Sequence, residues 1–139
     1  MFSVMTHHVG LDTAYKLAQK GMEIISDAWA ANYTSNYGGG TMRVIEFGSD
    51  NRFEPEYEFL YHVPTIEQVL TLLRNTYNIH VNPYPFSLGW AFEVQDLTKM
   101  DITGAKVLYT LGIPSQDQIY KTYEEAAEAG INYVLDKLL

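Results

Sequence analysis

The chain has 139 residues, which suits one domain with a hydrophobic core of useful size, so we predict a single domain over residues 1–139. Seventeen acidic residues against nine basic ones give a net charge of -8, which opposes binding to nucleic-acid phosphates and to anionic membranes. Cysteine is absent, which excludes disulfides, thiolate zinc sites and thiol nucleophiles. No signal peptide or membrane-spanning run is recognisable, and a cytoplasmic location is therefore expected.

The first predicted element is a short amphipathic helix over residues 11–20. Leu11, Ala14 and Leu17 recur on one face, and Gly21 suits the left-handed position that ends a helix. Residues 22–31 also show helical spacing, but the sequence then becomes rich in Tyr, Ser, Asn and Gly. We expect a broken helix there, and a flexible connector plus a hairpin over residues 33–63.

The predicted hairpin has arms at residues 42–47 and 53–63, on either side of Gly48-Ser49-Asp50-Asn51. The second arm alternates with period two, which is typical of a strand with two different faces. One predicted face is aromatic and apolar, with Phe53, Pro55, Tyr57, Phe59, Tyr61 and Val63. The other is mostly acidic, with Glu54, Glu56, Glu58, Leu60 and His62.

Residues 64–139 are predicted to form a core unit in the order helix, three strands, helix. Thr65 and Gln68 have the spacing of a capping box at the start of the first helix, and Asn78 can end that helix. Strands are expected at residues 79–84, 88–95 and 105–111, and their short connections favour antiparallel pairing. Thr122 and Glu125 form a second capping box, which opens a final helix over 122–139.

The predicted fold class is therefore α+β: an antiparallel sheet with helices packed on one face, and an N-terminal β-hairpin extension. In the final helix the apolar and small residues share one face that needs a partner layer. That face comprises Tyr123, Ala126, Ala127, Gly130, Ile131, Val134, Leu135 and Leu138.

Several of these motifs resemble a family of small uncharacterised proteins encoded by phages and integrated elements of gut Bacteroidota. The resemblance rests on Pro-Thr-Ile-Glu-Gln-Val-Leu at 64–70, Leu-Arg-Asn-Thr-Tyr-Asn-Ile-His-Val at 73–81, the Trp-bearing second strand, Thr-Tyr-Glu-Glu-Ala-Ala-Glu-Ala-Gly at 122–130, and Leu-Asp-Thr-Ala at 11–14 with Gly-Met at 21–22. Residues 32–50 depart from the family pattern. The resemblance implies an origin in a mobile element and a bacterial host cell, and it implies no chemistry.

The order helix, three strands, helix also resembles the double-stranded RNA-binding domain, which contacts phosphates through lysines at the start of its last helix. Tyr123, Glu124 and Glu125 occupy that place here, with Glu128 one turn later. Carboxylates at these positions would repel the duplex. Nucleic-acid binding is therefore a disfavoured alternative.

Residues 46–67 form the densest acidic region, with six carboxylates and one arginine. One interpretation is a solvated strand edge that charge protects from aggregation. The other is a docking face for a basic or DNA-binding host protein. In this interpretation the protein-binding residues are Glu54, Glu56, Glu58, Tyr57 and Tyr61. A homodimer is the second partner considered, because it would cover the aromatic side of the hairpin.

No catalytic residue, cofactor or metal site is predicted. The four histidines lack a metal-binding spacing, although His62 and His80 could meet across a sheet and, with Glu58, offer a weaker candidate ligand set. A small metal-dependent enzyme that uses such ligands is thus the alternative from another class. The sequence favours a non-catalytic accessory protein that acts by binding another protein.

Overall fold

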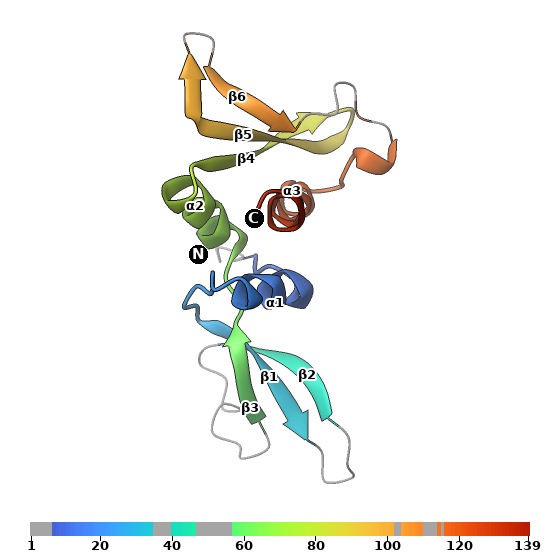
Figure 1. Cartoon of the computed structure of the whole chain (residues 1–139). Helices are drawn as coiled ribbons and strands as arrows, with labels where there is room; N and C mark the ends of the chain where they lie inside the picture. Colours follow the sequence, from blue (N-terminus) through green and yellow to red (C-terminus); the bar gives the residue numbers. More distant parts are fainter. Residues whose placement is uncertain (1–6, 35–39, 47–56, 102–103, 110–113, 115) are drawn as a thin grey trace, which may run out of the picture. The chain divides into compact units, whose positions relative to one another are not determined.

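The computed structural model describes residues 7–34, 40–46, 57–101, 104–109, 114 and 116–139. Its helices and antiparallel strands form an α+β fold, which confirms the predicted class (Figure 1). The chain divides into two compact units, Met1–Thr65 and Ile66–Leu139. Each unit contains its own three-stranded sheet. A single domain over the whole chain stays a prediction.

The first unit opens with α1 (Leu11–Gln19), the helix expected at residues 11–20. Gly21 ends it with a φ of 70°, as predicted. The amide of Gly21 donates to the carbonyl of Ala18, and the amide of Met22 donates to that of Leu17. These two bonds form a Schellman motif, and Met22 at its end is buried.

The strands of the first unit are β1 (Ala28–Thr34), β2 (Gly40–Glu46) and β3 (Tyr57–His62), in the spatial order β2-β1-β3. The broken helix expected over 22–31 is wrong, because β1 begins within it. Ala28, Ala30 and Ala31 are all fully buried, so both faces of the strand are covered. A strand buried on both faces is a continuous apolar run, which periodicity cannot distinguish from a helix.

The N-terminal hairpin is present, but its arms differ from the predicted ones. β1 pairs with β2 in the hairpin, and β1 also pairs with β3 on its other side. The predicted pairing of residues 42–47 with 53–63 is therefore wrong, since β1 lies between them. The proposed turn at 48–51, and residues 53–56 of the second arm, lie outside the described residues.

A β-bulge divides the aromatic residues of β3 between two faces. Ala30 pairs with Tyr61 and the next residue, Ala31, pairs with Phe59, so Leu60 is an extra residue without a partner in β1. Because adjacent residues of a strand point to opposite faces, Phe59 and Tyr61 also do so. The predicted single aromatic face of residues 53–63 is thus wrong where the structure describes it.

The Tyr61 face of this sheet is covered by α1. The rings of Tyr15 and Tyr61 lie 6.0 Å apart, and Tyr61 is only 7% exposed. Leu17 and Ala14 of α1 are also buried, which completes the core of this unit. The amide of Val9 donates to the carbonyl of Pro64 at 3.0 Å, and this bond joins the beginning of the unit to its end.

The second unit follows the predicted order. It comprises α2 (Ile66–Thr76), β4 (Ile79–Phe86), β5 (Gly89–Asp101), β6 (Gly104–Tyr109), a short 3-10 helix η2 (Gln116–Gln118) and α3 (Tyr123–Lys137). The strands form an antiparallel sheet in the order β4-β5-β6. Helices α2 and α3 contact this sheet and each other from one side (Figure 1). Asn78 ends α2 with a φ of 56°, as predicted.

The final helix starts where the capping residues place it. The amide of Glu125 donates to Oγ1 of Thr122 at 3.1 Å, and Oε2 of Glu125 accepts from the amide of Lys121 at 3.2 Å. The carboxylate thus reaches one residue further back than in a standard capping box. The predicted inner face is buried from Ala126 to Leu135. Gly130 permits close packing, because a Cβ there would overlap Cγ1 of Val81.

Candidate protein-binding surface

Large apolar side chains are exposed at the bulge of β3. Phe59 is 52% exposed and Leu60 is 37% exposed, and the neighbouring Glu58 is also exposed. Ile25, in the segment before β1, is 82% exposed. We call Glu58, Phe59 and Leu60, three consecutive exposed residues of the edge strand β3, the β3 surface. Exposed apolar groups beside a charged rim are typical of sites where proteins bind other proteins.

His62 attaches the segment before β1 to β3. Its backbone amide donates to Oε1 of Glu23 at 2.6 Å, and its Nδ1 lies 3.3 Å from the amide nitrogen and 3.2 Å from the carbonyl oxygen of Ser26. The tautomer of the ring decides which of these two backbone groups it bonds. The Phe59 ring packs against His62 with centroids 5.1 Å apart, so His62 also supports a side chain of the β3 surface.

A second histidine orders the carboxylate of Asp27. Nε2 of His8 lies 3.2 Å from Oδ1 of Asp27, and the hydroxyl of Ser26 donates to the same oxygen at 3.3 Å. The hydrogen bond with His8 is the main cause that lowers the pKa of Asp27, and it outweighs the opposite effect of burial. Asp27 is therefore held ionised, and with the exposed Glu23 and Glu58 it gives this unit an acidic rim.

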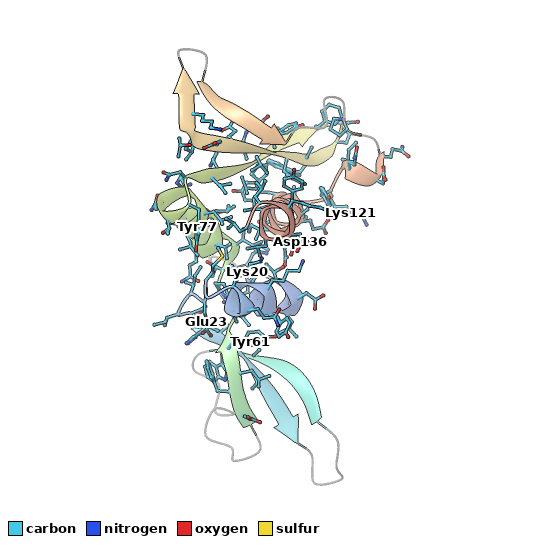
Figure 2. The ribbon with its side chains drawn as sticks, in the orientation of Figure 1. Lys20, Glu23, Tyr61, Tyr77, Lys121 and Asp136 are labelled. Atoms are coloured by element: carbon cyan, nitrogen blue, oxygen red, sulfur yellow. The ribbon has the colours of Figure 1, made fainter. Side chains whose placement is uncertain are left out.

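The predicted protein-binding residues have different outcomes. Glu58 is exposed on β3, whereas Glu54 and Glu56 lie outside the described residues. Tyr57 is the first residue of β3 and pairs with Tyr33 of β1. Tyr61 lies at the α1 end of β3 (Figure 2), and its burial raises its pKa. Burial against Tyr15 favours a packing role for Tyr61 over the predicted contact role.

The two histidines considered as metal ligands belong to separate sheets. His62 is in β3 and His80 is in β4, so the predicted pairing across one sheet is wrong. Within the described part of the chain, no three His, Asp or Glu side chains are grouped as a metal ion would need.

Among the same residues, no helix combines the length and apolar character that a membrane crossing requires.

Sequence reasoning missed the apolar part of the β3 surface. Strict alternation placed Phe59 on the same aromatic face as Tyr61, and the bulge that separates them depends on pairing with a distant strand. One signal was present in the sequence: Leu60 is the apolar residue of a predicted face that also holds Glu54, Glu56, Glu58 and His62. An apolar residue within an acidic row of an edge strand indicates a contact surface.

Comparison of the chain with protein-family models, with curated proteins and with solved structures gives no significant match. The β3 surface is therefore interpreted from the chemistry of its own side chains.

Proposed function

We propose that the protein is a non-catalytic accessory protein of a phage or integrated element, and that it binds another protein through the β3 surface. One observation carries the proposal: Phe59 and Leu60 are adjacent, apolar and exposed at the bulge of an edge strand, and the preceding residue, Glu58, is also exposed. Complete burial of a Phe or Leu side chain contributes about 1.5–3 kcal/mol. A partner that covers both side chains removes them from water, and this burial contributes to the affinity of the complex.

The acidic rim defines the kind of partner. Glu58 carries the charge of this surface, Glu23 and Asp27 are further exposed carboxylates of the same unit, and the whole chain has a net charge of -8. Such a surface attracts a basic protein and repels other acidic proteins. A basic or DNA-binding protein in the cytoplasm of the bacterial host fits this description. The partner would place an apolar group against Phe59 and a lysine or arginine near Glu58.

The test is capture from nuclease-treated host lysate with the tagged full chain. We expect the double variant Phe59→Ala and Leu60→Ala to lose a basic protein that the wild type retains. Leu88→Ala is the matched control, because Leu88 is an exposed apolar side chain of the other unit. Equal retention of the captured proteins by all three chains would refute the proposal. Circular dichroism of each variant checks that it is folded.

Self-association is the competing way to cover Phe59 and Leu60, as in the homodimer considered from the sequence. Sedimentation of the wild-type chain over a range of concentrations separates the two arrangements. A monomer in solution supports a foreign partner. A dimer that dissociates in the double variant would assign the same surface to a second copy of this chain.

A further inference from the structure

The sheet of the second unit has a face that points away from its helices. Val81 and Phe92 point toward Gly130 of α3, since a Cβ at Gly130 would lie within 3.1 Å of both. Side chains alternate along a strand, so Asn82 and Glu93 lie on the opposite face. The register makes these two direct cross-strand partners. The same face holds the pairs His80 with Gln95 and Tyr84 with Ala91, and it is partly covered, since Ala91 is fully buried and His80 is half-buried.

Glu93 is the centre of a hydrogen-bonded group on this face of the sheet. Its Oε1 accepts from Nδ2 of Asn82 at 3.2 Å and from Nε2 of Gln95 at 2.9 Å. Because both amides donate to Glu93, their carbonyl oxygens remain available as acceptors. The second carboxylate oxygen of Glu93 is a third available acceptor. Among the described side chains, no lysine or arginine forms an ion pair with Glu93.

This set of acceptors requires a ligand that only donates. A guanidinium group has five N–H donors in one plane and a permanent positive charge, which match a carboxylate flanked by amide carbonyls. Asn82, Glu93 and Gln95 are half-buried, so a charge-assisted bond there is screened less than one on a fully exposed surface. Tyr84 lies one residue pair further along the same face, where its ring can stack on a planar cation.

We propose that Glu93, Asn82 and Gln95 form a recognition site for an arginine side chain of a basic protein or peptide. The site is separate from the β3 surface and does not depend on its proposed role. Glu93 supplies the charge, and the two amides hold its carboxylate in place and add carbonyl acceptors. Lysine fits less well, because the three donors of its ammonium group sit on one nitrogen, whereas the donors of a guanidinium group are spread over three nitrogens and can reach separate acceptors.

The direct test is an NMR titration of the full chain with two blocked tripeptides, acetyl-Gly-Arg-Gly-amide and acetyl-Gly-Lys-Gly-amide. The side-chain NH₂ signals of Asn82 and Gln95 report on the site itself. We expect these signals to shift with the arginine peptide, and the lysine peptide to bind about tenfold more weakly. Glu93→Gln should reduce affinity for the arginine peptide by about tenfold, as expected for the loss of a charged hydrogen bond.

The matched control is Asp12→Asn, which removes one negative charge from an exposed residue of the other unit and should leave the affinity unchanged. Equal losses in Glu93→Gln and Asp12→Asn, or equal binding of both peptides, would mean attraction by net charge alone and would overturn the proposal. Absence of shifts at Asn82 and Gln95 in the wild type would also overturn it. If Glu93→Gln does not fold, Gln95→Ala keeps the carboxylate and should bind about threefold more weakly.

Discussion

At the scale of single residues, His80 links the stability of the second unit to pH. Burial is the largest cause that lowers the pKa of His80, the charge of Arg74 lowers it further, and Glu93 acts in the opposite direction. The unfolded chain, in which the histidine pKa has its ordinary value of 6.5, therefore binds a proton more readily than the folded chain. The stability that depends on neutral His80 is present above this pH and is lost as pH falls toward the folded pKa.

Replacing His80 tests this linkage. In His80→Gln, the free energy of unfolding should fall less between about pH 7.5 and about pH 5.5 than in the wild type, because the buried group no longer titrates. Urea denaturation at both pH values measures the difference. His7→Gln, which alters an exposed histidine, should keep the wild-type dependence. If the free energy of unfolding of His80→Gln falls with pH as much as that of the wild type, groups other than His80 cause the acid sensitivity.

The turn between β4 and β5 contains a second unusual residue. Phe86 pairs with Gly89, so Ser87 and Leu88 form a two-residue turn, with φ values of 45° and 64°. Such turns favour Asn and Gly, because a side chain in the left-handed region costs about 1–2 kcal/mol. Leu88 is also fully exposed, so no packing within the described chain offsets this cost.

Leu88→Gly should therefore stabilise the protein. Glycine removes the left-handed strain and adds flexibility to the unfolded chain, and the net gain is expected to be about 0.5–1 kcal/mol. The midpoint of urea denaturation measures it. Leu138→Gly is the control, because Leu138 is also partly exposed but has a φ of -113°. This control should give no gain, and a gain of equal size in both would contradict the explanation by backbone strain.

At the scale of elements, helices were easier to predict than strand pairing. Thr122, Gly21 and Asn78 mark helix ends by local chemistry, and the structure confirms all three. Strand partners depend on residues far apart in the chain, so the order β2-β1-β3 could not be read from local patterns. The acidic character of the candidate site was visible in the sequence. Its apolar residues depend on the bulge at Leu60 and were not visible.

The edge strand β4 shows how sequence protects a sheet edge. The amide of Leu97 donates to the carbonyl of Asn78, which sets the alternation of hydrogen bonds along the β4–β5 pair. By this alternation, the backbone nitrogens of Pro83 and Pro85 point away from β5. Proline has no amide hydrogen, so this edge cannot donate to another strand at these positions. The proposed arginine site therefore uses the face of the sheet and not this edge.

Packing of α3 on the sheet depends on Gly130. In Gly130→Ala the new methyl group would overlap Cγ1 of Val81 and press on Phe92. We expect a net loss of about 1–2 kcal/mol in the free energy of unfolding, although alanine favours helix by about 1 kcal/mol. Thermal or urea denaturation measures the loss.

Val81→Ala provides the control for this explanation. The smaller side chain makes room, so the double variant Gly130→Ala and Val81→Ala should lose less stability than the sum of the single losses. Strict additivity would show that the two positions are not coupled and that close approach at Gly130 is not the cause.

At the scale of the whole molecule, the negative charge is shared equally. Residues 1–65 contain eight acidic and four basic residues, and residues 66–139 contain nine acidic and five basic ones. Each unit thus attracts basic partners by itself. This balance agrees with two separate proposals, the β3 surface in the first unit and an arginine site in the second.

The division into two units leads to the last prediction. The second unit contains the buried residues Leu73, Val94 and Ile131, and α2 and α3 both contact strands of that unit. Residues 66–139 alone should therefore fold, with dispersed NMR amide signals and cooperative urea unfolding. A collapsed or unfolded product would show that the first unit completes its core and would support a single domain over the whole chain. Residues 64–139, which include Thr65, serve as the matched fragment for testing whether this residue helps α2 to begin.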